Sequence, residues 1–249
     1  IIMAKKKKVV KEKVDQRLTF LNAQIAAAKQ AFNNDNIYAI SEHSKMLYGI
    51  PFPSLALEYL FTSNVMLMSK LIGLAGQKGS LKSSFGFEIL RWFIEWRGLG
   101  ALVETENKIS EQCGNVLQDM QPYCQLALVK STQAAQQQVS FCEEKHASSE
   151  DMKDVPLCIV IDSLTGSEGD KTKEDMVTTG HAVKGYSENA LIWTTWLRAK
   201  SADLIGKPIS IVFTNHLKEK VGGAVRPGMP AQKTTPGGKG QEFHATYYV

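Results

Sequence analysis

The sequence predicts an α/β fold in which helices cover both faces of a mostly parallel central sheet. Short apolar runs of strand length recur along the chain, at 71–75, 100–106, 125–129, 156–162 and 208–215. Segments with helical periodicity lie between them, at about 83–98, 131–145 and 187–205. A chain of 249 residues, 43% of them hydrophobic, can bury the core of one large domain with small extensions.

Composition argues against zinc, disulfide-rich and membrane proteins. The chain has four widely spaced cysteines without a C-x-x-C motif: Cys113, Cys124, Cys142 and Cys158. Cys158 lies in an apolar run and is predicted to be a small core residue. No apolar run is as long as a membrane span, so we expect no membrane partner and a cytoplasmic location. The formal net charge of +4 is too small to indicate nucleic acid by itself.

The N-terminal region, residues 1–45, is predicted to be a basic arm followed by a helix, and residues 46–249 the core. Residues 1–13 read IIMAKKKKVVKEK, and turn-forming NNDN stands at 33–36. A helix from Asp15 to Phe32 is indicated by apolar residues at helical spacing: Leu18, Leu21, Ile25, Ala28 and Phe32. Two roles remain open for it, a cap on the core or an arm that docks on another subunit.

The stretch GLAGQKGSLKSSFGF at 73–87 resembles a phosphate-binding P-loop, G-x-x-x-x-G-K-[ST], between a strand and a helix. Leu81 stands where the motif has its second glycine, so a chance turn of glycine and lysine is the alternative. In a P-loop, Lys82 would reach the outer phosphates of a nucleotide and Ser83 would bind magnesium. The predicted nucleotide-binding residues are Gly76, Gln77, Lys78, Gly79, Ser80, Leu81, Lys82, Ser83 and Ser84.

Three more strands end in polar residues, and the carboxyl ends of parallel strands share one edge of a sheet. Asp162 ends PLCIVID, where it could hold magnesium or simply cap the next element. Glu106 ends GALVETE and could deprotonate an attacking water, or Glu104 and Glu106 could be two solvated acids. His216 follows ISIVFTN, where it could sense a γ-phosphate or be an ordinary surface histidine.

Residues 216–241 are rich in glycine, proline and lysine without a regular period, and we expect a loop there, followed by a strand in EFHATYYV. The loop is basic and has no aromatic residues, which suits contact with a DNA backbone better than base stacking. Its candidate DNA-binding residues are Lys218, Lys220, Arg226, Lys233 and Lys239. A merely solvated charged loop is the alternative.

Taken in order, GQKGSLKSS, ALVETEN, CIVIDSLTG, ISIVFTNH and TTPGGKGQEFHATYYV resemble the ATPase core of RecA-type recombinases, over roughly Met46 to Val249. The likeness is greatest to UvsX-like phage recombinases, which also carry a bulky residue at the position of Leu81 and Asn-His after the fifth strand. It implies a RecA-like P-loop NTPase core that binds ATP and Mg²⁺ and pairs single-stranded DNA with a homologous duplex, in a host cytoplasm if viral.

The resemblance also implies roles for particular residues. Lys82 would bind the β- and γ-phosphates, Ser83 and Asp162 would hold Mg²⁺, Glu106 would position the water and His216 would sense the γ-phosphate. Residues 178–186, with Lys184, would form a first DNA loop and residues 217–241 a second. Such proteins form helical filaments in which ATP lies between neighbouring copies and the N-terminal helix docks on the next one.

The chain departs from the family pattern in three places. Leu81 is one: a φ below zero there would cost little, whereas a positive φ would mean strain. Ser110 stands where an acid often approaches the adenine, and the chain stops before further strands of the family, so we expect a longer natural protein. Two other functions stay open, the ATPase of a replicative helicase and an assembly protein of RecA fold that does not hydrolyse ATP.

Overall fold

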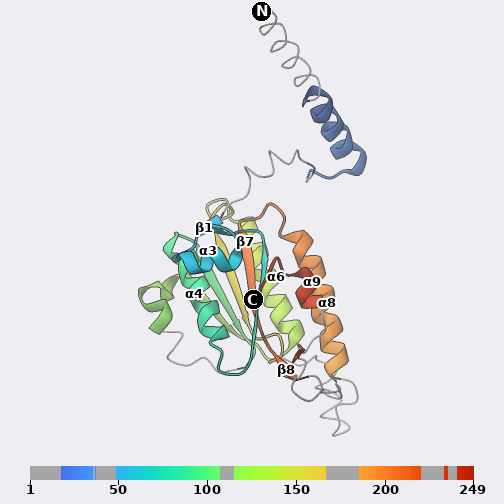
Figure 1. Cartoon of the computed structure of the whole chain (residues 1–249). Coiled ribbons are helices and arrows are strands. Elements are labelled where there is room, and N and C mark those ends of the chain that lie inside the picture. Colours follow the sequence, from blue (N-terminus) through green and yellow to red (C-terminus); the bar gives the residue numbers. More distant parts are fainter. Residues whose placement is uncertain are drawn as a thin grey trace, which may run out of the picture. The chain divides into compact units, whose positions relative to one another are not determined.

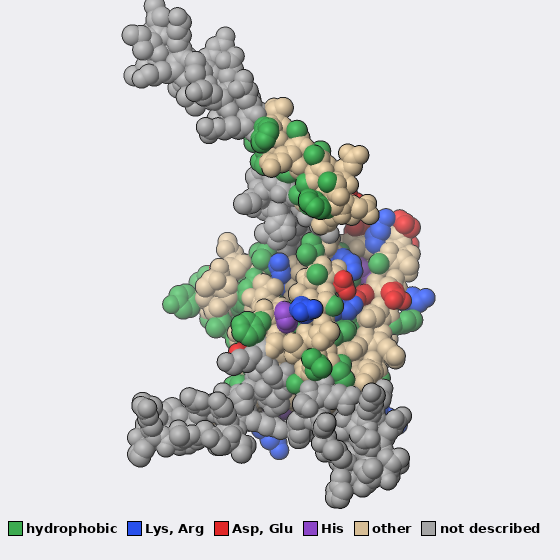
Figure 2. All heavy atoms as spheres, turned by 90° about the vertical axis from the view of Figure 1, so that its right-hand side faces the viewer, with side chains coloured by type: hydrophobic (Ala, Val, Ile, Leu, Met, Phe, Trp, Pro, Cys, Tyr) green, Lys and Arg blue, Asp and Glu red, His purple; other side chains and the backbone are tan. Residues whose placement is uncertain are grey.

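A computed structural model describes residues 18–35, 37, 49–106, 115–166, 185–219, 233–234 and 240–249. The chain divides into two units, Ile1–Tyr48 and Gly49–Val249. In the first unit residues 18–32 form a helix, as predicted, while the start predicted at Asp15 and the basic arm lie outside the described residues. Its apolar side chains are exposed along its surface (Figure 2), among them Leu18, Phe20, Leu21 and Phe32.

The second unit is built on a six-stranded sheet whose strands are all parallel, so the predicted α/β fold with a parallel sheet is confirmed (Figure 1). Across the sheet the strands are β10 (Tyr247–Tyr248), β3 (Leu71–Gly76), β7 (Ile209–His216), β6 (Leu157–Asp162), β4 (Leu99–Glu104) and β5 (Cys124–Leu128). The order of the strands in the sheet differs from their order along the chain. Helices connect the strands, so that each new strand runs in the same direction as the one before it.

Helices cover both faces of the sheet (Figure 1). One face carries α4 (Lys82–Glu95) with the small elements β1 (Gly49–Pro51), α3 (Leu55–Phe61) and β2 (Val65–Leu67). The other carries α6 (Thr132–Ser148) and α8 (Gly185–Asp203), with α9 (Gly240–His244) packed on α8. A 3₁₀ helix, Gln118–Tyr123, leads into β5. None of the helices in the described part of the chain is long and apolar enough to cross a membrane.

Strand side chains alternate between two cores, one on each face of the sheet. In β6, Cys158 and Val160 pack in the core beneath α4, whereas Ile159 and Ile161 pack in the core beneath α6 and α8. This period of two explains why the strand is apolar at every position from Leu157 to Ile161. Cys158 is fully buried, which confirms its prediction as a core residue.

Three expectations need correction: the strand at the chain end, the irregular loop at 216–241 and the placement of Glu106 at the end of a strand. The predicted terminal strand is instead α9 followed by the two-residue β10, because Gly240 packs tightly on Thr194 and Gln241 is buried. The predicted loop contains an antiparallel pair, β8 (Lys218–Glu219) with β9 (Lys233–Thr234). Strand β4 ends at Glu104, so Glu106 lies beyond it. Strand β5 is an edge strand, with Leu126 and Leu128 exposed.

Candidate active site

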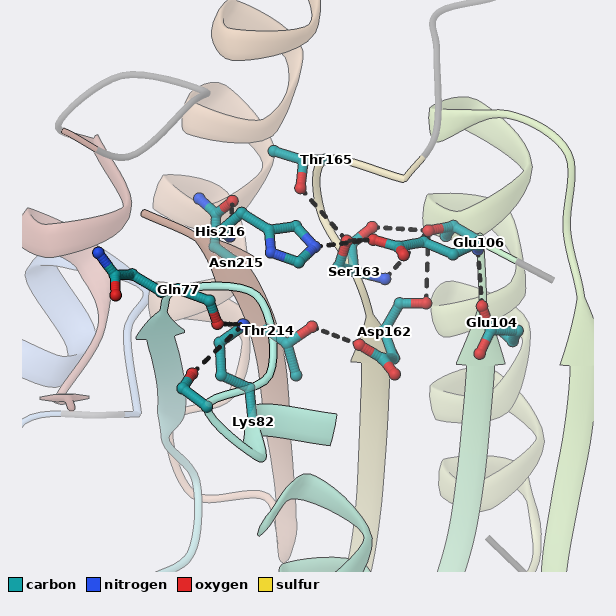
Figure 3. Close-up of polar contacts among 12 residues, drawn as sticks. Gln77, Lys82, Glu104, Glu106, Asp162, Ser163, Thr165, Thr214, Asn215 and His216 are labelled. Atoms are coloured by element: carbon teal, nitrogen blue, oxygen red, sulfur yellow. Dashed lines mark hydrogen bonds and ion pairs between the residues drawn. The ribbon is translucent and has the colours of Figure 1, made fainter. Parts of the chain in front are cut away.

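The candidate site lies at the carboxyl edge of the sheet, where four strands from distant parts of the sequence end (Figure 3). Register brings their last residues together: Gly76 pairs with His216, and Glu104 pairs with Asp162. Four of the residues with predicted chemical roles therefore come from four segments to one edge: Lys82, Glu106, Asp162 and His216.

The predicted P-loop residues form a tight turn between β3 and α4. A Cβ atom added at Gly76 would lie 2.2 Å from the Oγ atom of Ser80 and 3.3 Å from the Cδ atom of Lys82. Gly79 has a φ of +82°, which favours glycine. The backbone N–H of Ser80 donates to the carbonyl of Gln77 at 3.2 Å and closes the turn. The backbone conformation of the loop thus favours glycine at position 79, and the close approach of the Ser80 side chain favours glycine at position 76.

Leu81, in place of the motif's second glycine, has a left-handed backbone with φ +61° and ψ +21°. This conformation brings the Cβ atom of an L-residue too close to its own backbone. Its side chain is 72% exposed, so packing offsets little of that strain. Leu81 is also the N-cap of α4 and makes no side-chain cap hydrogen bond. The positive φ shows that leucine at this position is strained.

Lys82 begins α4 and spans the turn before it. Its Nζ atom donates to the carbonyl oxygen of Gln77 at 2.8 Å and to the Oγ atom of Ser80 at 3.5 Å (Figure 3). Burial lowers the pKa of Lys82, and the carboxylates of Asp162 and Glu106 oppose that shift. The first turn of α4 contains no acidic residue, so its positive dipole end and the ammonium group favour an anion here.

Asp162 is oriented by a neighbour that sequence reasoning did not identify. The hydroxyl of Thr214, fully buried in β7, donates to the Oδ1 atom of Asp162 at 2.5 Å. Ser83, the other predicted magnesium ligand, is the second residue of α4. No cluster of three His, Cys, Asp or Glu side chains suited to a metal occurs among the described residues. The carboxylate of Asp162 and the hydroxyl of Ser83 fit Mg²⁺, which takes few protein ligands and completes its shell with water and phosphate oxygens.

Glu106 is held by two donors that reach the same oxygen. The hydroxyl of Ser163 donates to Oε1 at 2.5 Å, and the Nε2 atom of His216 lies 3.2 Å from it (Figure 3). Its backbone N–H donates to the Oε1 atom of Glu104 at 2.6 Å. Glu104 is buried and the Glu106 side chain is only 14% exposed, so the alternative of two solvated acids is wrong.

His216 is positioned by the residue before it. Asn215 is fully buried, and its Oδ1 atom accepts the backbone N–H of His216 at 2.8 Å. The amide nitrogen of Asn215 donates in turn to Gln241 of α9, which is also buried. The segment that returns to β10 therefore supports the strand end that carries the histidine.

The structure describes only some of the remaining predicted site residues. Ser84 lies in α4, and Lys78 is exposed on the P-loop. Lys218 and Lys233 lie in β8 and β9, where Lys218 pairs with Thr234. The other predicted DNA-binding residues lie outside the described residues: Lys184, Lys220, Arg226 and Lys239. Ser110 lies outside them as well.

Sequence reasoning gave no role to Thr105, Ser163, Thr214 or Gln241, which orient the site. A signal was available for Thr105 and Ser163 alone, because they stand directly beside the predicted site residues Glu106 and Asp162 in the sequence. Comparison with known proteins adds no assignment: no protein-family model matches the chain, and no curated protein matches it significantly.

Proposed function

We propose that this chain is an ATP-dependent recombinase of the RecA type, closest to the phage enzymes, which binds single-stranded DNA and pairs it with a homologous duplex in recombination and repair. The observation that carries the proposal is the convergence of Lys82, Glu106, Asp162 and His216 at one edge of a parallel sheet. A cationic loop, a held carboxylate and a histidine at that edge are what hydrolysis of a nucleotide phosphate requires.

Binding of ATP is assigned to the P-loop and the start of α4. Lys82 now donates to Gln77 and Ser80 within the loop, and we expect its ammonium to turn to the β- and γ-phosphates when ATP is bound. The free N–H groups at the start of α4 would donate to the same phosphates. A bound magnesium ion supplies positive charge against the phosphate oxygens, and Ser83 and Asp162 would hold it.

Hydrolysis is assigned to Glu106. Its carboxylate orients the attacking water and accepts a proton from it, while His216 senses the γ-phosphate. The contact of 3.2 Å between His216 and Glu106 connects these two roles. Lys218 follows His216 by two residues, so a change at the histidine passes directly into the predicted second DNA loop. ATP-bound copies would form a filament on single-stranded DNA, and hydrolysis would weaken the contact with DNA.

The test is the ATPase rate of the purified chain with Mg²⁺, with and without single-stranded DNA. We expect hydrolysis that single-stranded DNA accelerates. Glu106→Gln should retain ATP-dependent DNA binding yet lose turnover, and Lys82→Ala should lose nucleotide-dependent DNA binding. Glu144→Gln, on the exposed side of α6, is the matched control and should change neither property.

Two outcomes would replace the proposal. Processive unwinding of a duplex without homologous pairing would indicate a helicase ATPase of the same fold. Absence of ATPase both with and without DNA would indicate an assembly protein that does not hydrolyse ATP. Normal hydrolysis by Glu106→Gln would refute the catalytic assignment alone.

A further inference from the structure

We propose that Ser163 is a positioning residue for Glu106, and that the turn of residues 163–166 fixes the catalytic carboxylate before ATP arrives. This inference rests on the proposed function, because it concerns how the proposed catalytic carboxylate is held. It adds a role for the hydroxyl group of Ser163 and for Gly166, both of which lie beyond the end of β6.

The contact between Ser163 and Glu106 is of the strong, charge-assisted kind. A hydroxyl that donates to a carboxylate oxygen at 2.5 Å is at the short end of such hydrogen bonds. Ser163 is 1% exposed, so water does not compete effectively for this bond. Since Ser163 and His216 meet the same oxygen from two different strand ends, the carboxylate is constrained from two directions (Figure 3).

Ser163 is itself held firmly by Thr105, the neighbour of Glu106. The backbone N–H of Ser163 donates to the Oγ1 atom of Thr105 at 3.0 Å, and the hydroxyl of Thr105 donates to the carbonyl of Ser163 at 2.7 Å. The next residue, Leu164, donates its N–H to the carbonyl of Thr214 at 3.0 Å. The segments that follow β4 and β6 are thereby tied to each other and to β7, around the hydroxyl that holds Glu106.

Gly166 closes the other side of the Glu106 side chain. A Cβ atom added at Gly166 would lie 2.2 Å from the Cγ atom of Glu106 and 2.5 Å from the Oγ1 atom of Thr105. Real Cβ atoms do not approach other atoms this closely, so any larger residue must displace the Glu106 stem. The turn therefore supplies both a hydrogen bond to the carboxylate and a surface against its methylene groups.

This arrangement has a specific kinetic consequence. A free glutamate side chain has many rotamers, and holding one of them in advance favours the reacting geometry. In the proposed mechanism Glu106 acts on the attacking water, whereas Lys82 and the P-loop bind the phosphates. Loss of the Ser163 hydroxyl should therefore lower kcat and leave ATP binding unchanged.

The experiment compares Ser163→Ala with the wild type in the DNA-stimulated ATPase assay, together with direct binding of a non-hydrolysable ATP analogue. We expect kcat to fall about tenfold while KM and the Kd of the analogue stay the same. Ser210→Ala is the matched control, because Ser210 is a buried serine near the start of β7 whose hydroxyl has no hydrogen-bond partner among the residues that the structure describes. Its kcat should equal that of the wild type.

Two further variants keep the inference open to refutation if Ser163→Ala does not fold. Ser163→Cys preserves the shape but donates weakly, and it should also lower kcat. Gly166→Ala should lower kcat by displacing Glu106, again without a change in analogue binding. An unchanged kcat in folded Ser163→Ala or Ser163→Cys would overturn the inference while the proposed function stands. A wild-type chain without ATPase activity would overturn both.

Discussion

Replacing Leu81 by glycine, and in a second protein by alanine, directly tests the backbone strain in the turn before α4. At an exposed position inside a helix, a glycine variant has a free energy of unfolding about 1 kcal/mol lower than the alanine variant. At position 81 we expect the opposite order, because the backbone has a φ of +61°. Both substitutions remove the same exposed leucine side chain, so their difference isolates the effect of the Cβ atom.

The magnitude follows from two opposing terms. Relief of the left-handed conformation favours glycine by about 1–2 kcal/mol. The larger conformational entropy of glycine in the unfolded chain disfavours it by about 0.4–1 kcal/mol. Leu81→Gly should therefore exceed Leu81→Ala in free energy of unfolding by roughly 0.5–1 kcal/mol, or about 2 °C in Tm for a domain of this size.

The assay is urea denaturation of each variant, followed by circular dichroism and checked for an unchanged m-value. Gln137, exposed in the middle of α6, supplies the control pair: Gln137→Gly should be less stable than Gln137→Ala. If Leu81→Ala proves as stable as Leu81→Gly or more stable, leucine is not strained at this position and the reasoning is refuted.

Three further predictions concern other parts of the core. Thr214→Val removes the hydroxyl that orients Asp162, so the Mg²⁺ concentration for half-maximal ATPase should rise about tenfold; an unchanged Mg²⁺ titration would contradict this role. Glu143→Gln leaves the buried ammonium of Lys200 without its ion-pair partner, so it should lower the free energy of unfolding, measured in urea, by about 3 kcal/mol. The double variant Glu143→Leu with Lys200→Met removes both charges and should lower that free energy by less. Burial raises the pKa of the thiols of Cys142 and Cys158, so a thiol reagent should label them only in denaturant, as judged by mass spectrometry; labelling of native Cys158 would show that its core opens.

Much of the fold could be predicted from the sequence because buried parallel strands have a strong local signal. The runs of β3 and β6 are apolar at nearly every position, and β7 is apolar over residues 211–213, which indicates cover on both faces of the sheet. The strand expected over the whole of EFHATYYV is wrong, because the structure of the chain end depends on distant partners. Gln241 lies in a helix that packs on α8 and bonds to Asn215, and nothing in EFHATYYV itself indicates either contact.

The candidate site contains residues of two kinds. A sequence motif identifies some of them, and only the pairing register of the strands identifies the others. Lys82 and Asp162 stand at the ends of recognisable strand and loop patterns, so their convergence could be expected from a parallel sheet alone. Thr214 lies inside an apolar strand, where threonine is common for its β-branched shape, and it gains a role only because β6 and β7 pair Ile161 with Phe213. The next residues, Asp162 and Thr214, then meet as carboxylate and donor. A shift of one residue in that register would turn the hydroxyl to the opposite face of the sheet. Strand pairing therefore determines which residues orient the proposed catalytic groups. The catalytic groups can be predicted from the sequence alone, whereas the residues that hold them cannot.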